Sequence, residues 1–139
     1  MAGALTAAVP ARAQECPGNP DVLGTSRVLV LEPGTLTRVG LMQYPQTLPL
    51  ADKEVVLTFD DGPWPDNTPM VLKALQDNCA KATFFEIGEH STWRPDLTKE
   101  LVDAGMTVGT HTWSHKDLAK NPYAKDIEQA KQELSLIHI

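Results

Sequence analysis

The chain has 139 residues, of which 42% are hydrophobic, and its formal net charge is -6. This length and composition fit one globular domain or part of one and exclude a disordered chain. The acidic balance argues against a surface that binds nucleic-acid phosphates, and no run approaches the roughly 20 apolar residues of a membrane helix.

The first residues have the character of the end of an export signal. Residues 1–15 are mostly small and apolar, and Ala11, Arg12 and Ala13 form the small-x-small pattern that signal peptidase accepts. The cationic start of a signal peptide is missing, so a disordered Ala-rich leader is the alternative. We expect an exported protein, periplasmic or extracellular.

The chain contains two cysteines, Cys16 and Cys79. In an exported protein such a pair can form a disulfide, although spacing alone does not show that the two residues meet. Two free thiols are the alternative. Neither cysteine belongs to a Cys-x-x-Cys pair, which argues against a cysteine zinc site.

The next segment, residues 16–53, is predicted to be an N-terminal extension. It is rich in Pro, Gly and Thr, and the apolar alternation at residues 27–33 predicts a strand within it. The organised domain is predicted to span residues 54–133. The last residues, 134–139 (LSLIHI), are interpreted as an artefactual tail that is foreign to the domain.

Strands and helices are predicted to alternate along the domain. One helix should bury Val71, Leu72 and Leu75, and a second should bury Leu97, Leu101 and Val102 and stop at Gly105 in a left-handed conformation. Such alternation builds a parallel sheet through right-handed crossovers, so the predicted fold class is α/β. The predicted strands cover residues 54–59, 82–88 and 106–111, and the predicted helices cover residues 67–78, 95–106 and about 123–134.

Polar side chains follow two of these strands. Asp60 and Asp61 come directly after the first strand, and His111 follows the third. The carboxyl ends of parallel strands share one edge of the sheet, so these side chains should lie close together. His115 follows His111 by four residues, which places a second imidazole on the same side of a turn. Two histidines and one carboxylate leave a fourth position on a zinc-like ion open for water.

The adjacent carboxylates of Asp60 and Asp61 suggest a division of roles. They would repel each other in a bare pocket, and a bound dication would relieve the repulsion and leave one of them free to act as a base. Alternation along a regular strand would point the two side chains in different directions. An Asp-Asp-Gly sequence also occurs in ordinary turns, so the metal hypothesis depends on the carboxylates and histidines sharing one sheet.

The chain also contains three tryptophans and two further histidines. Trp64 and Trp113 lie beside the two motifs and are candidates for stacking on a sugar, although large rings near loops also cover cores. Trp93 is expected to have that covering role. His90 and His138 are expected to be surface residues.

Three motifs in this order and spacing resemble the polysaccharide deacetylase family, the carbohydrate esterases built on the NodB-homology domain. They are LTFDDGP (residues 57–63), ATFFEIG (82–88) and GTHTWSH (109–115). The resemblance covers residues 54 to about 133, roughly the first half of that catalytic domain. It implies a distorted (β/α) barrel, here interrupted after about three βα units. It also implies a divalent metal, zinc or cobalt, and an N-acetylated polysaccharide or oligosaccharide as substrate.

The resemblance also implies roles for individual residues. Asp61, His111 and His115 would bind the metal, and Asp60 would be the general base in metal-assisted removal of acetyl groups from N-acetylglucosamine in chitin or peptidoglycan. The family's later motifs, including its general-acid histidine, are absent, and His138 follows a helix too soon to replace that residue. Uncovered apolar faces and an open sheet edge then predict an aggregation-prone product with impaired catalysis.

Two other functions remain open. A hydrolase of the same fold that acts on non-sugar C–N bonds, such as those of a cyclic amide, would share the metal motif. A non-catalytic metal- or glycan-binding module would share it without releasing acetate. Phosphoryl transfer through an aspartyl nucleophile is disfavoured, because the aspartate pair of that chemistry is separated by one residue and Asp60 and Asp61 are adjacent.

Overall fold

The computed structural model covers most of the predicted domain. The expected leader, Cys16 and His138 lie outside the described residues, and Leu134 is the only described residue of the expected tail. Within the part of the chain that the structure describes, no helix has the length and apolar character needed to cross a membrane. The described residues are 21, 22, 24, 25, 27–30, 38, 39, 44–120, 122 and 126–134.

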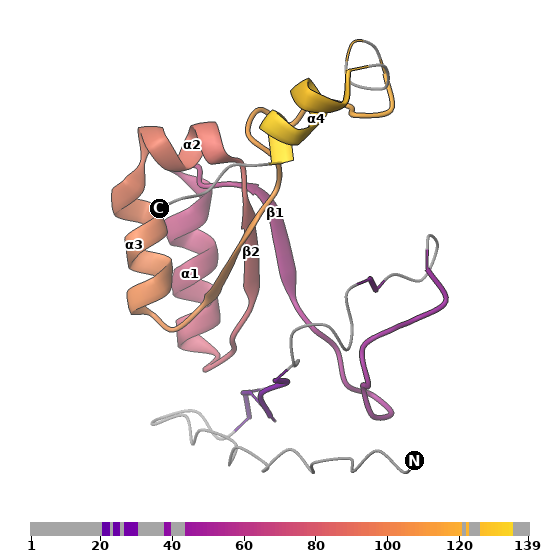
Figure 1. The fold of residues 1–139 in the computed structure, drawn as a ribbon. Helices are drawn as coiled ribbons and strands as arrows, with labels where there is room; N and C mark the ends of the chain where they lie inside the picture. The colour runs from indigo at the N-terminus through magenta and orange to yellow at the C-terminus, as the bar shows by residue number, and fades with distance from the viewer. Residues whose placement is uncertain are drawn as a thin grey trace.

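Strands and helices alternate in the described part of the chain, which confirms the predicted α/β class. The three strands form one parallel sheet in the order β1-β2-β3. Helices α1 and α3 lie along one face of this sheet, α2 lies beside α3 at the strand ends, and α4 lies apart from them (Figure 1). The elements are β1 (Thr58–Gly62), α1 (Asn67–Asp77), β2 (Thr83–Glu86), α2 (Gly88–Trp93), α3 (Pro95–Asp103), β3 (Thr107–Thr110) and α4 (Ile127–Leu134).

The core lies between the sheet and the helices. Phe84 of β2 is buried and its ring stacks on Phe59 of β1, with the ring centroids 5.2 Å apart. Fully burying one such side chain stabilises a fold by about 1.5–3 kcal/mol. Leu72 and Leu75 of α1 are buried as predicted, and Val71 packs partly buried against them. The buried core cluster consists of Leu72, Leu75, Ala82, Phe84, Leu101 and Met106.

The first predicted strand is displaced in the structure. β1 begins at Thr58 and includes both aspartates, whereas Val55, Val56 and Leu57 lie outside any strand and are exposed, Val55 by 78%. The prediction that this apolar run is buried is therefore wrong. Apolar composition leads to burial only where another element covers the segment, and among the described strands β1 pairs with β2 alone.

The apolar stripe of α3 also differs from the prediction. Leu97 and Leu101 are buried, but Val102 is exposed and Thr98 takes the buried place. Thr98 Oγ1 donates a hydrogen bond of 2.7 Å to Glu86 Oε2, which turns this side of the helix toward the sheet. Gly105 has a φ of +73° and ends the helix in the left-handed conformation, as predicted.

The described part of the N-terminal segment docks on the domain through polar contacts. Residues 27–30 form no strand, so the strand predicted here is wrong for its described part. The Gly24 N–H donates to the Asn78 carbonyl (3.3 Å) and Thr25 Oγ1 donates to the Cys79 carbonyl (3.3 Å). Cys79 is disulfide-bonded.

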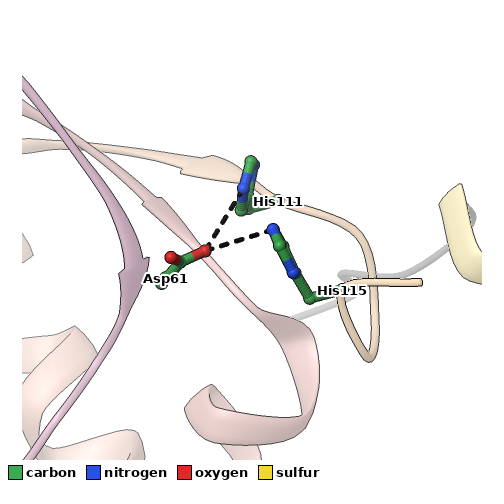
Figure 2. A group of neighbouring side chains, drawn as sticks. All are labelled: Asp61, His111 and His115. Atoms are coloured by element: carbon green, nitrogen blue, oxygen red, sulfur yellow. Dashed lines mark ion pairs between the residues drawn. The ribbon is translucent and has the colours of Figure 1, made fainter. Parts of the chain in front are cut away.

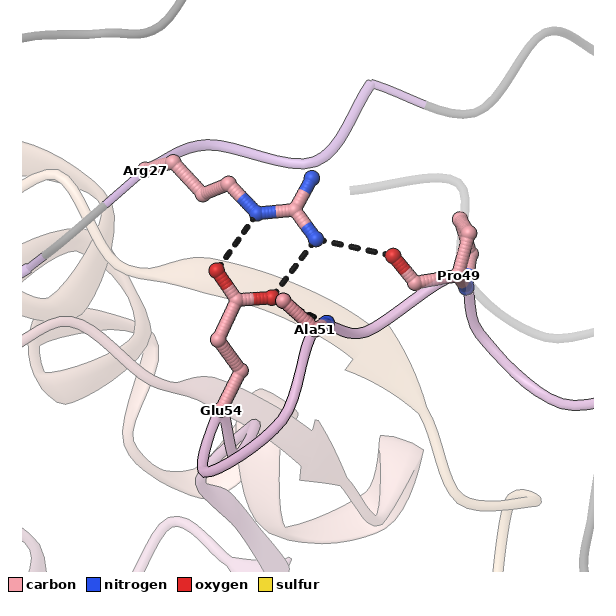
Figure 3. Close-up of polar contacts among 4 residues, drawn as sticks. All are labelled: Arg27, Pro49, Ala51 and Glu54. Carbon is pink, nitrogen blue, oxygen red and sulfur yellow. Dashed lines mark hydrogen bonds and ion pairs between the residues drawn. The ribbon is translucent and has the colours of Figure 1, made fainter.

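An ion pair joins this N-terminal segment to the residues before β1 (Figure 3). Arg27 donates from Nε to Glu54 Oε1 (2.8 Å) and from Nη2 to Glu54 Oε2 (2.6 Å). The same Nη2 donates to the Pro49 carbonyl (2.8 Å), and the Ala51 N–H donates to Glu54 Oε2 (2.7 Å). The contact between the two segments is thus a bidentate ion pair between side chains.

This ion pair predicts a pH-dependent stability. The hydrogen bonds from Arg27, and then that from Ala51, lower the pKa of Glu54 from 4.5 to about 2. Because the folded-state pKa is the lower one, the pair stabilises the fold above about pH 4.5 and loses this contribution as the pH falls toward 2. We expect the difference in free energy of unfolding between the wild type and Glu54→Gln, measured by urea denaturation, to shrink over this interval.

The variant Arg27→Gln removes the same pair from the other side. It should show the same reduced pH dependence, and salt should weaken the effect in the wild type because the pair is near the surface. A free-energy difference that persists unchanged down to pH 2 would contradict the assignment.

Candidate metal centre

Asp61 occupies an irregular position in β1. Asp60 pairs with Phe85 and Gly62 pairs with Glu86, so Asp61 is an extra residue in a bulge. Its φ is +69°, a left-handed conformation that Asp tolerates better than most residues. We expected regular alternation of side chains here, but β1 is irregular at Asp61, and bulges commonly redirect a side chain at a functional site.

The two histidines come from the loop that follows β3. The His111 N–H donates to the Glu86 carbonyl (2.8 Å), so this residue continues the alignment of β3 with β2. The chain then turns back through Thr112 (φ +63°) and His115 (φ +56°), and the His115 N–H donates to Thr112 Oγ1 (3.0 Å). The turn brings the two imidazole centroids within 4.8 Å of each other.

Asp61, His111 and His115 converge on one point (Figure 2). Asp61 Oδ1 lies 3.3 Å from His111 Nε2 and 3.4 Å from His115 Nε2, and the three ligand atoms all lie within 4.8 Å of one another. A charge-assisted hydrogen bond would be about 2.7–2.9 Å long. Ligand atoms around a tetrahedral ion with bonds of about 2.1 Å lie about 3.4 Å apart. The distances therefore fit a shared metal ion better than two ion pairs.

The cluster is open to solvent. The exposed fractions of the side chains are 55% for Asp61, 32% for His111 and 56% for His115. Three protein ligands of this kind on an accessible surface leave room for a further ligand, which is the arrangement of catalytic rather than structural zinc sites.

Asp60 directly precedes Asp61 in β1. Its side chain is exposed and, in the described part of the chain, forms no hydrogen bond or ion pair. Its carboxylate is thus available to accept a proton. Its role as general base stays a prediction.

His90 and Trp93 differ from what the sequence predicted. His90 Nδ1 lies 3.1 Å from the Asp61 carbonyl oxygen, and its ring packs against Trp64 (centroids 4.4 Å apart) and Trp93 (4.9 Å). His90 is half-buried, so the surface prediction holds in part, but its contacts place it next to Asp61, because β2 ends at the same edge of the sheet as β1 and delivers α2 to the site. Trp93 is exposed and does not cover the core.

Trp113 lies between the two histidines in the loop and is half-buried. Its backbone links two helices, because its N–H donates to the Glu133 carbonyl (2.9 Å) and its carbonyl accepts from the Glu89 N–H (3.0 Å). Stacking of Trp64 and Trp113 on a substrate stays a prediction.

Two residues near the site were missed by the sequence analysis. His90 had a usable signal, since it follows the end of a predicted strand by only a few residues, as Asp61 and His111 do. Glu133 had none, because a glutamate on an amphipathic helix is ordinarily solvated.

Comparisons with known proteins agree with this geometry. The model of the family described as polysaccharide deacetylase matches residues 48–138. A peptidoglycan-N-acetylglucosamine deacetylase of Bacillus cereus is 44% identical over 72 residues, which are 52% of this chain and 26% of that protein. A chitooligosaccharide deacetylase of Sinorhizobium fredii is 42% identical over 81 residues, covering 56% of this chain and 38% of that protein.

Solved structures of the family superpose on the described fold. A family 4 carbohydrate esterase from Streptomyces lividans aligns with a TM-score of 0.53 and 37% identity, over 58% of this chain and 40% of that one. A peptidoglycan deacetylase from Bacillus subtilis aligns with a TM-score of 0.51 and 35% identity, over 57% and 38%. The chain thus spans between a quarter and two fifths of the length of these four relatives. The family model matches most of this chain, and the expected partial barrel is confirmed. The chain therefore belongs to the polysaccharide deacetylase family.

Proposed function

We propose that this domain hydrolyses N-acetyl groups of N-acetylglucosamine-containing polysaccharide, of the chitin or peptidoglycan type, in a metal-dependent reaction. The observation that carries the proposal is the convergence of Asp61, His111 and His115, with the unpaired Asp60 directly before Asp61 in β1. Relatives named as peptidoglycan and chitooligosaccharide deacetylases support the substrate class.

The ligand set fits zinc best, with cobalt as an alternative. Nitrogen from two imidazoles and oxygen from one carboxylate are ordinary zinc ligands, and together they carry a single negative charge. A divalent ion held there would polarise the acetyl carbonyl and lower the pKa of bound water. Because the protein ligands do not fully neutralise a dication, the site would keep a net positive charge where an oxyanion develops.

Asp60 is the residue of this chain that we assign to proton transfer. Its side chain is exposed and free, and it immediately precedes Asp61 in β1. A carboxylate oxygen of Asp60 would accept the proton of the attacking water, which a base does best when it is ionised and unpaired. Asp61 would remain committed to the metal, so the two neighbouring carboxylates would have separate roles.

Aromatic side chains would hold the sugar. Trp64 and Trp93 are both exposed, and the His90 ring packs against each of them. Because His90 also contacts the Asp61 carbonyl, indole surface is available close to Asp61. Pyranose rings present C–H groups that pack on such surfaces while their hydroxyls stay hydrated. We assign substrate contact to Trp64 and, from the other motif, to Trp113.

Export to the periplasm or the outside of the cell is part of this proposal. The Ala11-Arg12-Ala13 pattern supports it. The disulfide at Cys79 supports it independently, because disulfides persist in oxidising compartments.

The metal assignment predicts the metal content of the protein. After dialysis against buffer with trace zinc, we expect elemental analysis to find about one zinc per wild-type chain and strongly reduced zinc in His111→Ala, because two remaining ligands bind zinc poorly. Asp103→Asn changes an exposed carboxylate on α3 and should leave the zinc content unchanged. Equal zinc in all three proteins, or none in the wild type, would contradict the site.

The division of roles predicts a separation of binding from catalysis. Asp60→Asn should lower acetate release from chitin oligosaccharides by about 10²–10⁴-fold, the usual contribution of a general base, and leave zinc content intact. Asp61→Asn should reduce both. The roles would be reversed if Asp60→Asn lost the zinc and Asp61→Asn kept it. Glycan binding that persists in Asp60→Ala, without acetate release by a chain completed with the family's later motifs, would indicate a non-catalytic module.

A further inference from the structure

Glu133 is a buried acid outside the metal centre. Its residue exposure is only 9%, although it lies near the end of α4, a helix set apart from the other three (Figure 1). Glutamate is rarely buried unless it is paired, because its carboxylate loses hydration. Its contacts therefore indicate what the burial serves.

Glu133 binds the loop that carries the histidines. Its Oε2 accepts from the Ser114 N–H (3.0 Å), its Oε1 accepts from Ser114 Oγ (2.8 Å), and its own carbonyl accepts from the Trp113 N–H (2.9 Å). Both carboxylate oxygens of Glu133 thus accept hydrogen bonds from Ser114, the residue directly before His115. By contrast, Glu128 on the same helix is exposed and pairs with Lys131 (2.7 Å) within α4.

The loop needs support from outside. Thr112 and His115 are both left-handed, a conformation that is unfavourable for non-glycine residues unless the surroundings stabilise it. On one side the N–H groups of Gly88 and Glu89 donate to the carbonyls of Thr112 and Trp113, each over 3.0 Å. On the other side the support is Glu133.

We propose that Glu133 is a positioning residue for the metal centre, holding the strained loop so that His115 faces Asp61. Glu133 acts through Ser114 and is not itself among the clustered ligand residues. Without it the loop can relax toward ordinary backbone conformations, and His115 moves away from its ligand position. This inference rests on the proposed metal binding, and residues that orient metal ligands typically contribute 10–100-fold to affinity.

The test measures the zinc dissociation constant by competition with a chromogenic chelator, together with the visible spectrum of the cobalt-loaded protein. We expect Glu133→Ala to weaken zinc binding by about 10–100-fold and to alter the cobalt spectrum. Glu133→Gln, which keeps one acceptor oxygen for Ser114, should recover part of the affinity. Glu128→Gln, a matched change on the same helix, should match the wild type.

A second variant keeps the test decisive if Glu133→Ala does not fold. Ser114→Ala removes only the contact between Ser114 Oγ and Glu133 Oε1, and we expect a smaller loss of affinity. Combined with Glu133→Gln, the loss should be less than additive, because both changes act on the contact between Ser114 and Glu133. Variants that melt at a lower temperature but keep the wild-type zinc affinity and cobalt spectrum would show that Glu133 only docks α4, and would overturn the proposal. A wild-type chain that binds no zinc would overturn this inference together with the proposed metal centre, whereas unchanged affinity in Glu133→Ala overturns this inference alone.

Discussion

The parallel pairing of β1 with β2 and of β2 with β3 is the constraint on which the candidate site depends. Gly62, Glu86 and Thr110 form one row across the sheet. Asp61 immediately precedes this row and His111 immediately follows it, so residues fifty positions apart in the chain meet at one edge. Antiparallel pairing of either strand would send one of them to the opposite edge, and no local feature of either motif could compensate.

The same sheet separates a stabilising face from a reactive edge. Below the site, Glu86 is fully buried and accepts hydrogen bonds from Ser91 Oγ (2.9 Å) and Thr98 Oγ1 (2.7 Å), which tie β2 to α2 and α3. Its other carboxylate oxygen has no partner among the described residues, so this anchor carries a desolvation cost. At the edge, the clustered ligand side chains stay accessible. The helices packed on the sheet stabilise the fold, whereas the clustered ligand residues lie at the sheet edge and contribute little to the core.

Three of the five described non-glycine residues with positive φ lie at the candidate metal centre. Asp61, Thr112 and His115 are all left-handed, and each takes part in a polar contact. The Asp61 carbonyl contacts His90, the Thr112 carbonyl accepts from the Gly88 N–H, and the His115 N–H donates to Thr112 Oγ1. His90 contacts the Asp61 carbonyl from α2, and Glu133 contacts the histidine loop from α4. The two motifs alone therefore do not build the centre, because helices from later in the chain hold each motif in its unfavourable conformation.

The amino-acid sequence by itself determined the alternation of strands and helices, the left-handed stop at Gly105 and the meeting of Asp61 with His111 and His115, because these follow from local propensity and from the rule that parallel strands end at one edge. The tertiary structure alone decided the bulge at Asp61, the exposure of Val55 and Val102, and the roles of His90 and Glu133. These depend on which surfaces other elements cover and which polar groups they supply. Such contacts join residues far apart in the chain, and a local pattern shows at most that a residue such as His90 lies near the sheet edge, not which contacts it makes there.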